Sequence, residues 1–330
     1  MHLRSRVASL IIVFGGLCGS ACSGPSLSTA SSEAGCPSCA VLAEADMPLL
    51  ELRSHDDSLF VLDEAGAIFA LPKAGGDLRG LVAHGSNAEH FGVTATDVAW
   101  VSLVDPSNRN LSQVHALGRE LLDRPELPAF QGPPLLAVGL GEGFVAAFLN
   151  GTSGSEVVRE TLQNGETSRP AETLTDEEQS ELPTIAGSDL EVVWCRAHAD
   201  QSSSLWRLSG TTDPTRTDYP FSCSDLWTTG NGDVFILDPS SGMNCYHRID
   251  ASGQDQLLTC TDQVYTNLTP LPSGSIAFID GGAAVRSMTP DGRISTLFSA
   301  DELVGIQNDG DLLYYATAAH IGSFPLKAAP

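Results

Sequence analysis

The chain has 330 residues, of which 41 are acidic and 17 are basic, so its formal net charge at pH 7 is −24. This excess of carboxylates excludes electrostatic attraction to nucleic acid or to an anionic membrane surface, because both carry negative charge. Hydrophobic residues make up 42% of the chain and charged residues 18%, which is typical of a folded chain and not of a disordered one.

The first 22 residues have the pattern of a targeting segment. Arg4 and Arg6 supply positive charge, and the apolar stretch of residues 7–17 is too short to span a bilayer. Three small residues, 19–21, form a cleavage site directly before Cys22. This pattern resembles a bacterial lipoprotein signal peptide, in which the cysteine carries the lipid and becomes the new N-terminus.

The resemblance implies that Cys22 anchors the chain in a membrane and that the protein resides in the bacterial cell envelope as an outer-membrane lipoprotein. The segment departs from the usual pattern, because Gly19 stands where leucine is commonest. Plain cleavage after Ala21, which would give a secreted or periplasmic protein, is therefore the alternative.

We interpret residues 23–39 as a flexible tether that contains one Cys-x-x-Cys motif. Residues 23–35 are rich in serine, alanine and glycine and show no apolar periodicity. Cys36 and Cys39 have redox-motif spacing, but no βαβ pattern follows them, which favours a local structural disulfide over a catalytic thiol pair. A zinc site of four cysteines is disfavoured because the other cysteines do not fall in close pairs.

Seven similar apolar runs organise the rest of the chain, residues 40–330. Each run has four consecutive apolar residues, which indicates a strand buried on both faces, and turn-forming residues stand before it. A second apolar patch lies upstream of most of these turns, so each unit is predicted to be a β-hairpin. The runs are residues 59–62, 98–101, 146–149, 192–195, 234–237, 276–279 and 312–315.

The spacing of these runs predicts the fold. Their mean separation is about 42 residues, the period of a β-propeller blade. Blades pack face to face, which explains strands that are apolar on both faces. We therefore expect an all-β fold, a monomeric seven-bladed β-propeller of four-stranded antiparallel blades in one domain. The alternative is a β-sandwich with evenly spaced strands.

The two ends of this domain are expected to meet. The seventh unit ends too early for a fourth strand, whereas a spare apolar segment, Ala40-Val41-Leu42-Ala43, precedes the first unit. Because an unpaired strand edge favours aggregation, we predict that residues near 40 to 45 complete the seventh blade as an N-terminal closing strand.

One outer hairpin resembles a known group of proteins. Residues 67–76 are similar to the x-Val-Pro-Lys-x-Gly-Gly hairpin of repeat lipoproteins from myxobacteria and their relatives, and Pro72-Lys73-Ala74-Gly75-Gly76 carries the match. Those proteins resemble β-propellers and mostly lack a known function. The later units lack this motif, so the resemblance implies a fold and a location but no activity.

Six cysteines remain after Cys18 and Cys22, an even number that favours disulfides in an oxidising compartment. If residues 251–254 form a hairpin loop, residue 250 faces residue 255 and Cys245 lies directly opposite Cys260. We therefore predict the disulfide Cys245–Cys260, and Cys195–Cys223 follows by elimination.

Four oxygen-bearing side chains form the only candidate ligand site that the sequence offers. They occupy one register position, directly after the apolar run of four units, and would lie on the same face of a propeller. Such a ring could bind a cation or the hydroxyl groups of a polar ligand. The alternative is that each side chain caps its own turn. The four residues are Asp63, Asn150, Asp238 and Asp280.

The sequence leaves the activity open. It contains none of the phosphate-binding, nucleophile-elbow, zinc-protease or EF-hand motifs, so we assign no catalytic residue, metal or cofactor. The first hypothesis is a lipid-anchored binding or scaffolding propeller with an envelope protein or a glycan as its ligand. The alternative is an extracytoplasmic propeller enzyme of the quinoprotein, lyase or glycan hydrolase type.

Overall fold

The computed structural model describes most of the chain after the tether. The described residues are 36–94, 96–105, 108–119, 129–131, 134–140, 143–150, 154–161, 169–170, 183–187, 191–209, 213–228 and 232–326. They form β-strands and connecting turns, and no helix in this part of the chain is long and apolar enough to cross a membrane. Cys22 lies outside the described residues.

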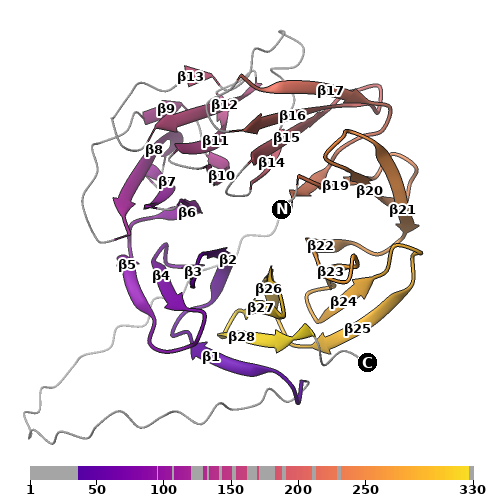
Figure 1. The fold of residues 1–330 in the computed structure, drawn as a ribbon. Coiled ribbons are helices and arrows are strands. Elements are labelled where there is room, and N and C mark those ends of the chain that lie inside the picture. The colour runs from indigo at the N-terminus through magenta and orange to yellow at the C-terminus, as the bar shows by residue number, and fades with distance from the viewer. Residues whose placement is uncertain are drawn as a thin grey trace, which may run out of the picture. The chain divides into compact units, whose positions relative to one another are not determined.

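The strands form seven antiparallel sheets of four strands each, numbered here as sheets 1 to 7 in chain order (Figure 1). Sheet 1 consists of β2 (Leu49–His55), β3 (Ser58–Asp63), β4 (Ile68–Pro72) and β5 (Arg79–Val82). Sheet 2 consists of β6 (Ala88–Val93), β7 (Asp97–Asp105), β8 (Asn108–Gly118) and β9 (Ala129–Gln131). Sheet 3 consists of β10 (Pro134–Leu140), β11 (Gly143–Asn150), β12 (Gly154–Thr161) and β13 (Arg169–Pro170).

The remaining sheets follow the same plan. Sheet 4 consists of β14 (Pro183–Gly187), β15 (Glu191–Ala197), β16 (Ser203–Ser209) and β17 (Thr215–Tyr219). Sheet 5 consists of β18 (Asp225–Thr228), β19 (Val234–Asp238), β20 (Asn244–Ile249) and β21 (Asp255–Thr261). Sheet 6 consists of β22 (Tyr265–Pro270), β23 (Ile276–Asp280), β24 (Ala284–Met288) and β25 (Ile294–Ser299). Sheet 7 consists of β26 (Leu303–Asp309), β27 (Leu312–Thr317), β28 (His320–Pro325) and β1 (Ala40–Glu44).

The fold is an all-β propeller with four-stranded antiparallel blades, as the sequence predicts. Each apolar run is part of the second strand of a sheet, and the run in β19 is buried throughout. The first strands of successive sheets contact one another in the order β2, β6, β10, β14, β18, β22, β26, and β26 contacts β2. Side chains of neighbouring sheets share core clusters, such as Phe60 of sheet 1 with Phe91 of sheet 2.

The N-terminal strand completes sheet 7, so the predicted closure is confirmed. β1 pairs antiparallel with β28, with Ala40 opposite Ser323 and Glu44 opposite His320 (Figure 1). The backbone N–H of Ala45 also donates to the carbonyl of Ala319 at 2.8 Å. The free edge that sheet 7 would otherwise present is thus paired by a segment from the other end of the domain.

The Cys-x-x-Cys motif is part of the packed domain. Cys36 and Cys39 form a disulfide and are 1% and 5% exposed. They pack in one core cluster with residues of sheets 6 and 7, including Phe298 and Phe324. Residues 36–39 were predicted to belong to the tether. A disulfide is apolar enough to be buried, and the packed structure begins before β1.

The other two disulfides also have the predicted pairings. Cys195 and Cys223 join β15 of sheet 4 to the segment that leads into sheet 5, and Cys245 joins Cys260 across β20 and β21. The strand register from which the Cys245–Cys260 pair was predicted is wrong at the hairpin turn, because Ile249, and not residue 250, faces Asp255. A bulge after Tyr246 shifts the pairing by one residue and brings the two cysteines opposite each other.

Candidate functional site

Asp63 binds the turn that follows its own strand. Its Oδ1 accepts hydrogen bonds from the backbone N–H groups of Ala65 and Ala67, at 3.0 and 2.8 Å. Its Oδ2 lies 2.9 Å from Nε2 of His84, which comes from the connection between sheets 1 and 2. The side chain of Asp63 is buried, so these groups replace the water that an ionised carboxylate needs.

The other predicted ring residues also have local partners where their side chains are described. Asp238 Oδ1 accepts from the backbone N–H groups of Ser240 at 2.9 Å and Ser222 at 3.2 Å. Asp280 Oδ2 lies 2.9 Å from Nε of Arg286 on the neighbouring strand. Asn150 ends β11 opposite Gly154, and its side chain lies outside what the structure describes. These contacts are those expected of turn caps and ion pairs.

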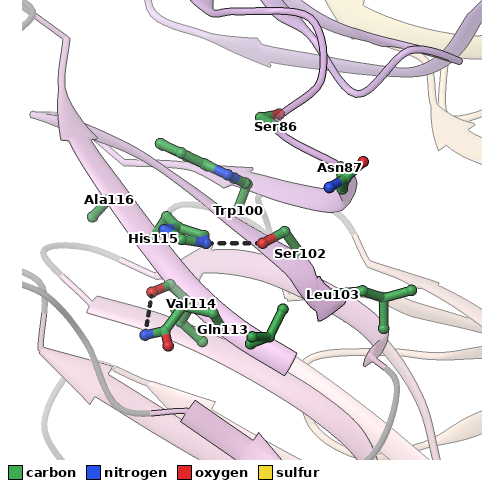
Figure 2. A pocket seen from close by; sticks show the side chains of 10 residues that line it. Ser86, Asn87, Trp100, Ser102, Leu103, Gln113, Val114, His115 and Ala116 are labelled. Atoms are coloured by element: carbon green, nitrogen blue, oxygen red, sulfur yellow. Dashed lines mark hydrogen bonds between the residues drawn. The ribbon is translucent and has the colours of Figure 1, made fainter. Parts of the chain in front are cut away.

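A pocket in sheet 2 is a concave site lined by described residues (Figure 2). Its volume is about 470 Å³, within the range that accommodates small-molecule ligands. Strands β7 and β8 supply most of the wall, and the loop before β6 supplies the rest. The lining residues are Ser86, Asn87, Trp100, Ser102, Leu103, Val104, Gln113, Val114, His115 and Ala116.

Two cross-strand pairs place the polar groups of this pocket. Trp100 faces His115 and Ser102 faces Gln113 in the register of β7 and β8, so all four side chains share one face of the sheet. The indole and imidazole rings are stacked with centroids 5.2 Å apart. Ser102 Oγ lies 2.8 Å from His115 Nε2, as the dashed line in Figure 2 shows. Trp100 Nε1 is buried without a hydrogen-bond partner among the described residues.

The loop from sheet 1 that covers this pocket is held by the turn that Asp63 caps. Ser86 Oγ donates to the carbonyl of Gly66, and the N–H of Gly85 donates to the carbonyl of Ala65 at 3.1 Å. Gly66 has φ +76°, and a Cβ there would lie 2.8 Å from the backbone nitrogen of Ala88. The turn and the loop therefore touch without room for a side chain between them.

This arrangement predicts a second role for Asp63. We expect Asp63→Ala to lower the free energy of unfolding by about 2 kcal/mol, because it leaves two buried N–H groups without acceptors. Because the turn also holds the loop, hydrogen exchange of residues 83–88 should become faster. Thermal melts and exchange mass spectrometry would measure both effects.

Asp238→Ala is the matched control, since Asp238 occupies the equivalent position in sheet 5 and does not contact this loop. It should destabilise the protein while exchange in residues 83–88 stays unchanged. Equal exchange of that loop in both variants would contradict the positioning role of Asp63.

A second group of titratable residues lies on the first strands of the sheets. Burial raises the pKa of Glu51 on β2, partly offset by Arg53, and burial lowers the pKa of His90 on β6 to about 4. Burial also raises the pKa of Asp225 on β18 to about 6, against which the hydrogen bond from the Leu226 N–H acts. Such perturbed groups can mark functional sites, but a fold can also produce them by burial alone.

Asp225 gives a pH-dependent prediction. Its folded-state pKa of about 6 exceeds the usual 3.8, so the folded state holds the proton more tightly. Its contribution to stability is therefore fully present below about pH 4 and is lost as the pH rises through about 6. Asp225→Asn cannot ionise and should gain on the order of 2 kcal/mol at pH 7 relative to wild type, with no gain at pH 4. Denaturant unfolding at both pH values measures this, and an equal effect at both would contradict it.

The candidate site was not apparent in the sequence. Trp100 belongs to an apolar run, and His115 lies in a strand 15 positions later, so neither residue alone indicates a pocket. Their register across β7 and β8, together with the loop from sheet 1, creates it. Among the described residues, no three His, Cys, Asp or Glu side chains are grouped as metal ligands.

Comparisons with known proteins identify the fold alone. No family model and no curated protein matches the chain. The β-propeller domain of Cps50 (Swd1) from Myceliophteria thermophila is similar with a TM-score of 0.63 and 12% identity, covering 87% of this chain and 99% of that one. Virginiamycin B lyase from Staphylococcus aureus is similar with a TM-score of 0.60 and 13% identity, covering 87% and 98%.

Proposed function

We propose that this protein is a lipid-anchored propeller of the bacterial cell envelope that binds a ligand in the pocket of sheet 2. In this proposal the seven sheets are the blades of one closed ring, and Cys22 carries the anchor. The observation that carries the binding function is the pocket itself, about 470 Å³ in volume and lined by aromatic, hydroxyl and amide groups. Pockets with this mixture of apolar walls and a few polar groups are typical ligand sites.

The disulfides support the location. Three pairs, Cys36–Cys39, Cys195–Cys223 and Cys245–Cys260, use all six cysteines that follow Cys22. Disulfides of this kind persist in oxidising compartments and are rare in the cytosol. A net charge of −24 disfavours adsorption to anionic lipid, so stable attachment to a membrane would need the covalent anchor.

The anchor is tested by Cys22→Ser in the full chain. If Cys22 is lipidated, the wild-type protein should fractionate with membranes, and its N-terminal peptide should carry the mass of acyl chains. The Cys22→Ser variant should lose both properties. Cys18→Ser is the control, because Cys18 lies within the cleaved segment, and it should behave as wild type. A wild-type chain that begins at Cys22 without acyl mass would instead establish plain secretory cleavage.

One observation favours the enzymatic alternative. The Ser102–His115 pair places an imidazole in the pocket, where it could accept a proton from a substrate. A lyase needs such a base, and a virginiamycin B lyase is among the proteins of similar fold. Glycan hydrolysis is less favoured, because the described lining contains no pair of carboxylates. Chemical conversion of a bound ligand that His115→Gln abolishes would select the enzyme; unchanged recovery of the ligand would select the binding protein.

A further inference from the structure

The charges of the sheet 2 pocket restrict what it can hold. Its polar groups are the hydroxyls of Ser86 and Ser102, the amides of Asn87 and Gln113, and the imidazole of His115. Among the described residues that line it, none is Asp, Glu, Lys or Arg. An anionic ligand would find no cation in the pocket and would approach a chain of net charge −24. A cationic ligand would find no carboxylate to pair with its charge.

The hydrogen-bonding groups exclude a purely apolar ligand as well. Trp100 Nε1 has no acceptor among the described residues, and a buried donor without a partner is unusual in folded proteins. Asn87 lies on the loop that borders the pocket, as Figure 2 shows, and is among the residues that line it. The Trp100 N–H is itself buried away from the pocket surface. A ligand that brings hydroxyl or carbonyl oxygens would instead pair with the hydroxyl and amide groups of the lining, whereas a hydrocarbon would leave them unpaired.

Two aromatic side chains also line the pocket. The rings of Trp100 and His115 are stacked on each other in the pocket lining (Figure 2). An aromatic face carries partial negative charge and attracts the weakly positive C–H groups of a saturated ring. The pocket therefore combines a surface for C–H groups with uncharged donors and acceptors for hydroxyl groups.

We infer that the sheet 2 pocket binds a neutral saccharide, with a sugar ring against Trp100 and its hydroxyl groups bound by Ser86, Asn87 and Gln113. This inference rests on the proposed binding function and specifies its ligand class. It makes the loop at Asn87 part of the recognition surface.

The test uses the full chain in a sugar-free zwitterionic detergent and a panel of neutral hexasaccharides: cellohexaose, maltohexaose, mannohexaose and chitohexaose. Saturation-transfer NMR identifies binding, and calorimetry measures Kd. We expect at least one member to bind. Trp100→Phe, which keeps an aromatic ring, should retain most of that binding, whereas Trp100→Ala should weaken it at least about 50-fold.

Trp194→Phe is the matched control, because Trp194 occupies the same position in the run of sheet 4 and is fully buried against Trp206. It should leave the saccharide affinity unchanged, and melting curves of all three variants would confirm that they fold. Absence of binding to every hexasaccharide, or binding that survives Trp100→Ala, would overturn the inference. A screen with neutral non-sugar compounds separates the outcomes: binding of one of these at Trp100 refutes the saccharide class but keeps the binding function.

Discussion

Gly322→Val is expected to be the most destabilising single substitution in this protein, with a loss of about 3 kcal/mol or more in the free energy of unfolding. Gly322 lies on β28 between Tyr315 of β27 and Val41 of β1. The ring of Tyr315 covers the glycine so closely that a Cβ at this position would overlap the ring. Tyr315 is fully buried and packs against Phe298, so the ring has no space into which it could move.

Gly80→Ala is the matched control for this prediction. Gly80 lies on β5, the outermost strand of sheet 1, and a Cβ there would lie 3.9 Å from the nearest side-chain atom, which belongs to Phe69, an ordinary contact. The alanine variant should unfold within about 0.5 kcal/mol of wild type. Thermal or urea unfolding of both variants is the measurement, and a Gly322→Val protein that melts like Gly80→Ala would show that the Tyr315 ring can move aside.

Deleting residues 40–45 should also have a large effect, a loss of about 4 kcal/mol together with aggregation that increases with protein concentration. The deletion removes the ladder between β1 and β28 and the packing of Leu42 and Ala43 on the core cluster of sheets 1 and 7. It also exposes β28 as a free edge, which can pair with another chain. Light scattering and thermal melts would detect both consequences.

Leu50→Ser provides the comparison for this deletion. Leu50 lies on β2 and its side chain is 54% exposed, so the substitution removes an apolar residue without opening a strand edge. It should change neither the melting temperature nor the scattering. A deletion variant that remains monomeric and melts like wild type would mean that β1 is dispensable for closure.

The second strands and the closure were predictable for a simple physical reason. A strand that is packed on both faces needs consecutive apolar residues, and residues 234–237 show this pattern without any knowledge of the fold. Closure by Ala40–Glu44 followed from matching a spare apolar segment with a missing strand. Pairing at the hairpin turn near residue 250 was not predictable, because a β-bulge leaves no clear mark in a single sequence.

The candidate site was much harder to predict. Aspartate after a strand serves both to cap turns and to bind ligands, and the sequence cannot separate these roles at Asp63 or Asp238. The structure separates them through the backbone N–H groups that each carboxylate binds. The pocket depends on the lateral register of Trp100 and His115 and on a loop from another sheet, which are tertiary properties.

The buried Cys36–Cys39 disulfide has a mechanical consequence. The disulfide lies directly before β1 and closes a covalent loop of residues 36–39. Tension applied to the chain before Cys36 is therefore transmitted to β1 through the S–S bond. The two cysteines of that loop are buried beside Phe298 and Phe324. A pull from the amino-terminal side must therefore extract these buried cysteines before it can peel β1 from β28. The pairing of β1 with β28, which closes the domain, is thus protected from such a force by the Cys36–Cys39 disulfide.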